Sequence, residues 1–127
     1  MAHAPAISAA PSSEAVLSKA VVRAATQLDL RQTQLARMLG LSAASASRLT
    51  SGAWQIRADS KSWELATAFV RLYRSLSAIT GGQPQAMRDW LHSGNDALGG
   101  GAPADRIVTA EGLIHVVQYL DAARGRI

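Results

Sequence analysis

The sequence predicts an all-α protein in which an N-terminal helix-turn-helix unit precedes a second, small helical part. Three observations support this fold class. Apolar residues recur at intervals of three and four along most of the chain, which is the spacing of one buried helix face. Ser or Thr residues precede these stretches and Gly residues follow them, as expected at helix ends. No segment alternates apolar and polar residues as a half-buried strand would.

The first predicted helix begins at a serine N-cap, which is Ser12 or Ser13. A serine oxygen at this position accepts a hydrogen bond from the free N–H groups of the first turn. The apolar stripe of the helix reaches Leu28, and residues 29–30 form a short break. Residues 1–11 are mostly Ala, Pro and Ser, so they offer little to bury and are expected to form a disordered tail.

Six further helical segments are predicted, which gives seven in total. Two short helices cover about residues 32–39 and 43–50, with Gly40 between them and Gly52 after them. Pro opens two of the later helices and Thr109 caps the last one, because both residue types suit a helix start. These later segments cover about residues 60–80, 84–91, 103–108 and 110 to near Gly125. The segments 53–59 and 93–102 are expected to be loops, and the glycine run at 99–101 is expected to be a flexible connection.

The composition excludes several classes of protein and site. The chain has 127 residues and no cysteine, which removes a disulfide framework, a thiolate metal site and a cysteine nucleophile. His3, His92 and His115 each lack a second ligand at metal spacing, and no cofactor is expected. Arginines interrupt every apolar stretch, so no transmembrane helix is predicted. No signal peptide is predicted either, and we expect a cytoplasmic location.

The positive charge is concentrated in the first half of the chain. The net charge is +4. Residues 1–60 contain six basic and three acidic residues, whereas residues 61–127 contain seven basic and six acidic residues. A basic N-terminal half is compatible with a polyanionic partner such as DNA, although a solvated surface explains the same excess.

Residues 32–52 read QTQLARMLGLSAASASRLTSG, which is a helix, a glycine turn and a second helix. Such a unit places its second helix in the major groove of DNA. Ala36 is small where the helices cross, and Gly40 can adopt the positive φ of the turn. The candidate DNA contacts lie at the start of the unit and on its second helix: Gln32, Ser42, Ala43, Ala44, Ser45, Ser47 and Arg48.

These candidate contacts form a weak set for reading bases. Only Arg48 carries a side chain that can pair bidentately with guanine. Ala46 stands where such units usually carry a branched aliphatic residue, so thin packing is expected there. DNA binding is therefore expected to be modest, dominated by phosphate contacts and dependent on a dimer. An ordinary helical hairpin in a protein core is the alternative interpretation of the same spacing.

The motif resembles the helix-turn-helix of Xre/Cro-type regulators in its Ala, Gly and Ser-Arg-Leu positions. A second pattern follows in the C-terminal half, and its residues are Trp90, Leu91, Asn95, Leu98, Gly99, Pro103, Thr109, Gly112, Val116 and Leu120. This pattern resembles the toxin-binding domain of the Xre/MbcA/ParS antitoxins, and the two parts follow the order of that family. The resemblance covers about residues 12–127.

The resemblance implies an antitoxin that binds a cognate toxin of the RES fold. Such toxins act on NAD as ADP-ribosyltransferases or NAD-degrading enzymes. The antitoxin covers the active site of the toxin, and the complex represses its own operon. The C-terminal end of the chain is the implied toxin contact: Asp121, Arg124, Gly125, Arg126 and Ile127. The implied partners are the toxin, operator DNA and a second copy of this chain.

The chemistry of the C-terminal end fits this implication. A guanidinium pairs well with a carboxylate in a toxin cleft, and the carboxylate of Ile127 can occupy the position of an NAD phosphate. The alternative is that Arg124 and Arg126 only complement the dipole of the last helix.

We therefore predict a DNA-binding part at residues 12–58 and a toxin-binding part at residues 59–127. Catalysis by this chain is not expected, because it contains no G-x-S-x-G nucleophile elbow and no Lys-Ser or Lys-Thr follows the glycine run. Two other functions remain open on sequence grounds. One is a plain dimeric repressor without a toxin partner, and the other is an adaptor whose helix-turn-helix no longer binds DNA.

Overall fold

The computed structural model describes residues 10–125 and confirms the all-α fold class. These residues contain no β-strand. The elements are α1 (Ser13–Gln27), α2 (Gln32–Leu39), α3 (Ala43–Ser51), α4 (Lys61–Ile79), α5 (Pro84–His92), the 3-10 helix η2 (Asp96–Leu98), α6 (Pro103–Arg106) and α7 (Ala110–Arg124). Within residues 10–125, no helix is long and apolar enough to cross a membrane.

The predicted helix starts are confirmed at four N-caps. The side-chain oxygens of Ser12 and Thr109 accept the backbone N–H three residues later at 3.0 Å. Ser42 and Ser60 do the same at 3.1 Å. Each bond satisfies one of the N–H groups that a helix start leaves free. Local residue choice therefore accounts for where these helices begin.

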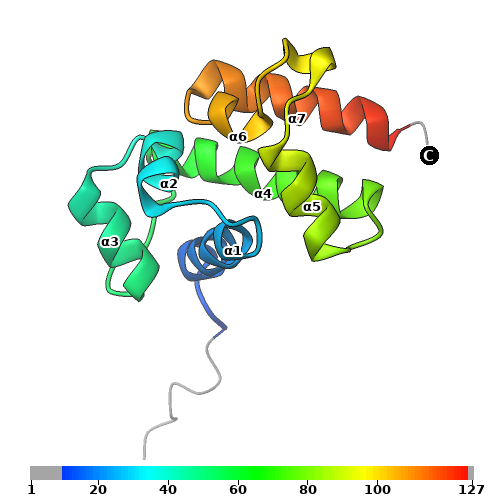
Figure 1. Cartoon of the computed structure of the whole chain (residues 1–127). Coiled ribbons are helices and arrows are strands. Elements are labelled where there is room, and N and C mark those ends of the chain that lie inside the picture. Colours follow the sequence, from blue (N-terminus) through cyan, green and yellow to red (C-terminus); the bar gives the residue numbers. More distant parts are fainter. Residues whose placement is uncertain (1–9, 126–127) are drawn as a thin grey trace, which may run out of the picture.

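The long helix α4 lies at the centre of the molecule, with α1, α2 and α3 on one side and α6 and α7 on the other (Figure 1). Phe69, Leu72 and Leu76 on α4 are fully buried. They belong to one continuous apolar core, to which α1, α2, α5, α6 and α7 all contribute. Both halves of the chain therefore pack against α4.

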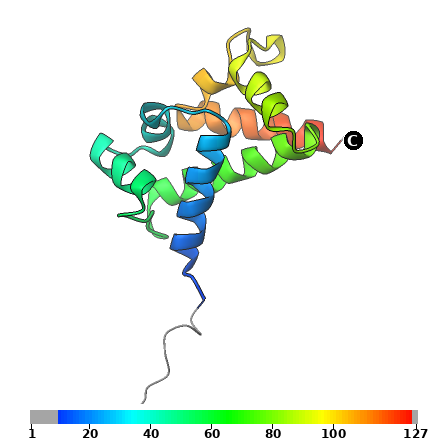
Figure 2. The ribbon, with the colours of Figure 1, turned by 60° about the horizontal axis from the view of Figure 1, so that its bottom comes forward.

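Helix α7 runs beside α4 in the same direction, as two views of the ribbon show (Figures 1 and 2). Its buried stripe consists of Leu113, Val116, Val117 and Leu120. The pairing continues to the last turn of α7, where Asp121 contacts both Ser75 and Arg71 on α4. The C-terminal end of α7 is therefore fastened to the second half of α4.

The segment 93–102 was predicted as a plain loop, and this was wrong in part. It contains η2, whose N-cap Asn95 accepts the N–H of Ala97 at 3.0 Å. The backbone of Asn95 also bonds to Gly100 at 2.9 Å and to Gly101 at 3.2 Å. The glycines therefore close a hydrogen-bonded turn, and their positive φ values at Gly99 and Gly100 suit it.

Two further details differ from, or lie beyond, the sequence predictions. Helix α6 ends at Arg106, with Ile107 as its C-cap, instead of reaching Val108. The predicted tail at residues 1–11 lies outside the described residues except for Ala10 and Pro11, which adopt no regular structure.

Candidate functional site

The α2–turn–α3 unit has the geometry of a helix-turn-helix. Gly40 ends α2 in the left-handed conformation at φ 68°, which a side chain would disfavour. The turn is closed by a hydrogen bond from the N–H of Leu41 to the carbonyl of Ala36 at 2.8 Å. Leu39 on α2 and Leu49 on α3 are buried on the inner faces of the two helices. The chain thus presents the outer face of α3 on a fixed support.

The outer face of α3 carries most of the predicted DNA contacts. Ala43, Ala44, Ser47 and Arg48 are exposed, and Ser45 is half-buried. Ala46, where thin packing was expected, is fully buried on the opposite face. The accessible set therefore consists of small side chains and one guanidinium.

Ser42 and Gln32 lie at different ends of this surface. The hydroxyl of Ser42 already accepts the N–H of Ser45, so its own proton remains to donate to a phosphate. Gln32, the first residue of α2, is exposed and lines a small hollow together with Thr50 near the end of α3. The structure therefore places Gln32 beside the last turn of α3 and Ser42 at its first turn, about 12 Å apart along the helix.

The last turn of α7 holds the described part of the predicted toxin contact. Asp121 accepts a hydrogen bond from the hydroxyl of Ser75 at 2.7 Å and forms an ion pair with Arg71 at 2.7 Å. Ser75 is fully buried. Arg124 is exposed and reaches the Ser75 oxygen at 3.4 Å. Asp121 is therefore partnered by two residues of α4, and Arg124 is an exposed charge that also donates to the Ser75 oxygen.

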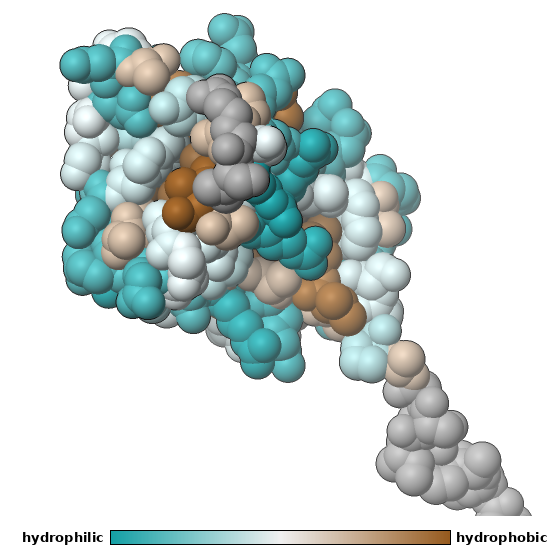
Figure 3. Space-filling model, turned by 90° about the vertical axis from the view of Figure 1, so that its right-hand side faces the viewer, coloured by the Kyte–Doolittle hydropathy of each residue, from teal (hydrophilic) through white to brown (hydrophobic). Residues whose placement is uncertain are grey.

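Gly125 takes an ordinary right-handed backbone at φ −68°, and its N–H bonds to the Asp121 carbonyl at 3.0 Å. The other two predicted contacts, Arg126 and Ile127, lie outside the described residues. The end of the molecule where α4 and α7 terminate presents mainly hydrophilic surface with isolated apolar patches (Figure 3).

Sequence reasoning missed Ser75 and Arg71 as partners of Asp121. The Ser75–Asp121 pair is 46 residues apart in the sequence, and no local spacing connects such residues. The one available signal was indirect, because two amphipathic helices with long apolar stripes are expected to pack against each other.

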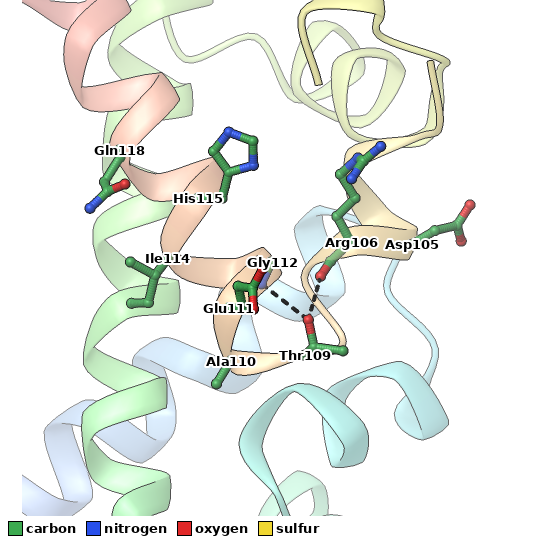
Figure 4. Close-up of a pocket in the computed structure, with 9 residues that line it drawn as sticks. All are labelled: Asp105, Arg106, Thr109, Ala110, Glu111, Gly112, Ile114, His115 and Gln118. Atoms are coloured by element: carbon green, nitrogen blue, oxygen red, sulfur yellow. Dashed lines mark hydrogen bonds between the residues drawn. The ribbon is translucent and has the colours of Figure 1, made fainter. Parts of the chain in front are cut away.

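A hollow of about 940 Å³, which sequence reasoning also missed, lies beside α6 and the first half of α7 (Figure 4). Its lining residues are Asp105, Arg106, Thr109, Ala110, Glu111, Gly112, Ile114, His115 and Gln118. A second hollow of about 380 Å³ lies between α4 and α7 and shares Ile114 and Gln118 with the first. The two hollows thus adjoin along one edge of α7.

His92 and Asp89 on α5 each form a hydrogen bond within the described chain. The Nε2 atom of His92 lies 2.7 Å from the carbonyl oxygen of Leu28, which joins α5 to the end of α1. Asp89 accepts a hydrogen bond from Gln85 one turn earlier in α5 at 2.7 Å. His92 therefore links α5 to the end of α1, and Asp89 bonds to a neighbour on α5 itself.

Comparisons with known protein families agree with both halves of this description. The model of the antitoxin Xre-like helix-turn-helix domain matches residues 8–71. The model of the antitoxin Xre/MbcA/ParS C-terminal toxin-binding domain matches residues 75–126. A comparison with curated proteins gives no match. The predicted resemblance is therefore confirmed, and the chain belongs to the Xre/MbcA/ParS antitoxins, with a helix-turn-helix domain followed by a toxin-binding domain.

Proposed function

We propose that this antitoxin neutralises a RES-fold toxin that consumes NAD, and that it represses its own operon as a homodimer on operator DNA. The observation that carries the proposal is the presence of both antitoxin domains, in this order, in one chain. The chemistry, ADP-ribosyl transfer or NAD degradation, belongs to the toxin. The antitoxin acts by covering the active site, and both proteins act in the cytoplasm.

The C-terminal end is the proposed blocking element. Arg124 stands exposed on the last turn of α7, which Asp121 fastens to α4 through Ser75 and Arg71. A fixed last turn lowers the entropy lost when the chain that follows enters a cleft. Arg126 would then pair with a carboxylate of the toxin, and Ile127 would follow it into the cleft.

Asp121 has a different role in this proposal from the one the sequence suggested. Its two carboxylate oxygens are already occupied by partners on α4. A toxin that bound Asp121 directly would have to share a largely buried carboxylate with these two partners. We therefore assign Asp121 to positioning of the last turn, and Arg124, Gly125, Arg126 and Ile127 to the contact itself.

The proposed DNA contact is dominated by the phosphate backbone. The exposed face of α3 offers only small side chains besides Arg48. Such a surface reads few bases, so affinity comes from phosphates and from the pairing of two half-sites by a dimer. The affinity for DNA is therefore expected to fall steeply as the salt concentration rises, and to be weak for a single protomer.

Co-expression with the product of the adjacent reading frame tests the toxin half of the proposal. We expect that product to have the RES fold, to arrest growth when expressed alone and to purify as a complex with this protein. An adjacent product that neither arrests growth nor binds would contradict the proposal and favour the plain repressor.

A gel shift on the upstream DNA tests the other half. Wild type should bind, and Arg48→Ala should bind more weakly by about 1–3 kcal/mol if Arg48 pairs with guanine. Arg74→Ala is the matched control, because it removes the same charge from an exposed position on α4. Equal binding by the Arg48 and Arg74 variants at several salt concentrations would mean that Arg48 makes no specific contact. Absence of binding by wild type would favour the adaptor.

A further inference from the structure

Ile114 is an exposed apolar residue on α7. Within residues 10–125, the exposed large apolar side chains are Val16, Ile79 and Ile114, and Ile114 is 42% exposed. It lines both hollows beside α7, whereas Val16 lines a separate one between α1 and α4. Ile114 is therefore the apolar side chain that the two hollows share, and a partner side chain that entered either hollow would contact it.

The surroundings of Ile114 form a polar rim around this apolar centre. Ile114 lines the larger hollow together with four long polar side chains, which are those of Arg106, Glu111, His115 and Gln118. Figure 4 shows Arg106 and His115 on opposite sides of this hollow. Interfaces of moderate affinity commonly combine a small apolar centre with a charged or polar rim.

The surface around Ile114 is continuous with the proposed blocking element. The smaller hollow contains Arg71 and Asp121, which fasten the last turn of α7. Ten residues of helix separate Ile114 from Arg124, which corresponds to about 15 Å. A partner of ordinary interface size, about 800 Å² on each side, can therefore cover Ile114 and the C-terminal end together.

We propose that the toxin docks on the edge of α7 centred on Ile114, with an apolar side chain of the toxin packed against Ile114. This inference rests on the proposed function and adds the surface that holds the toxin while the C-terminal end enters its active site. The occupant is the toxin and not a second copy of this chain, because both hollows adjoin α7 of the toxin-binding domain and the smaller one reaches Asp121 near the end of that helix.

The test is the affinity of the full-length protein for the RES-fold product of the adjacent reading frame, measured by titration. Ile114→Glu should weaken the complex at least 30-fold, because it places a charge at the apolar centre. Val16→Glu is the matched control, since Val16 is also β-branched, helical and 56% exposed. The control should bind within about threefold of wild type.

Two further measurements keep the test decisive. Ile114→Ala removes only contact area and should weaken binding about 5- to 10-fold, so it replaces the charged variant if that variant does not fold. Retained DNA binding in a gel shift shows that the N-terminal half is intact.

Wild-type affinity in both Ile114 variants would overturn the docking surface alone. Loss of self-association with unchanged toxin affinity would assign the surface to a second copy. Failure of wild type to bind the RES-fold product would overturn the proposed function, and the docking surface with it.

Discussion

Gly112→Ala should destabilise the protein, although alanine is the better helix former. Gly112 is the third residue of α7 and lies against the end of α6. A Cβ at this position would overlap the carbonyl oxygen of Arg106 and lie 2.8 Å from its carbonyl carbon. It would also lie 3.0 Å from Oγ1 of Thr109. The atoms in conflict belong to the backbone and to the helix cap, so no side-chain rotation relieves the overlap.

The magnitude follows from three opposing contributions. Replacement of Gly by Ala inside a helix contributes about 1 kcal/mol of stability. Overpacking costs about 1–3 kcal/mol, and the backbone position of this clash favours the upper part of that range. Displacement of Thr109 weakens its cap bond to the N–H of Gly112, drawn in Figure 4, at a cost of about 1 kcal/mol. The net destabilisation is about 2–3 kcal/mol, or roughly 6–12 °C in melting temperature.

Thermal unfolding followed by circular dichroism measures this effect. Gly125→Ala is the control, because its Cβ would lie 3.6 Å from the nearest atom and its backbone is right-handed. The control should melt at or slightly above the wild-type temperature. If Gly112→Ala also melts at or above wild type, α6 does not press on α7 as described and the reasoning is wrong.

Three further variants test other parts of the account. Ser18→Ala leaves the buried N–H of Ile56 without its 2.9 Å acceptor, so urea unfolding should show a loss of about 1–3 kcal/mol. Asp121→Asn weakens an ion pair in which Asp121 is 27% exposed, and the same assay should show a loss of about 1 kcal/mol. Arg124→Ala combined with Arg126→Ala should weaken inhibition of the toxin with little change in melting temperature, whereas a role limited to the helix dipole would lower stability by about 0.3–1 kcal/mol per residue and leave inhibition intact.

The helices were predictable because their ends depend on neighbouring residues. Ser42 caps α3 and Gly52 ends it at φ 85°, and both roles follow from residue type alone. The short η2 helix was not predictable in the same way. Its cap at Asn95 acts within a three-residue element, and the surrounding glycines have the composition of an unstructured loop.

The candidate sites also differ in how far the sequence predicts them. The outer face of α3 could be predicted, because helical periodicity decides which residues point away from Leu49. The attachment of Asp121 to Ser75 and Arg71 could not, since it depends on how two distant helices pack. The hollows beside Ile114 are likewise products of packing, and no single segment of the sequence encodes them.

Inhibition of NAD turnover is the most direct test of the central claim. The RES-fold product of the adjacent reading frame would be mixed with NAD, and this antitoxin would be titrated into the reaction. The account predicts that NAD consumption falls to the background rate at a fixed molar ratio of antitoxin to toxin. Undiminished NAD consumption at an excess of folded, toxin-bound antitoxin would contradict it, because the bound antitoxin would then leave the active site open.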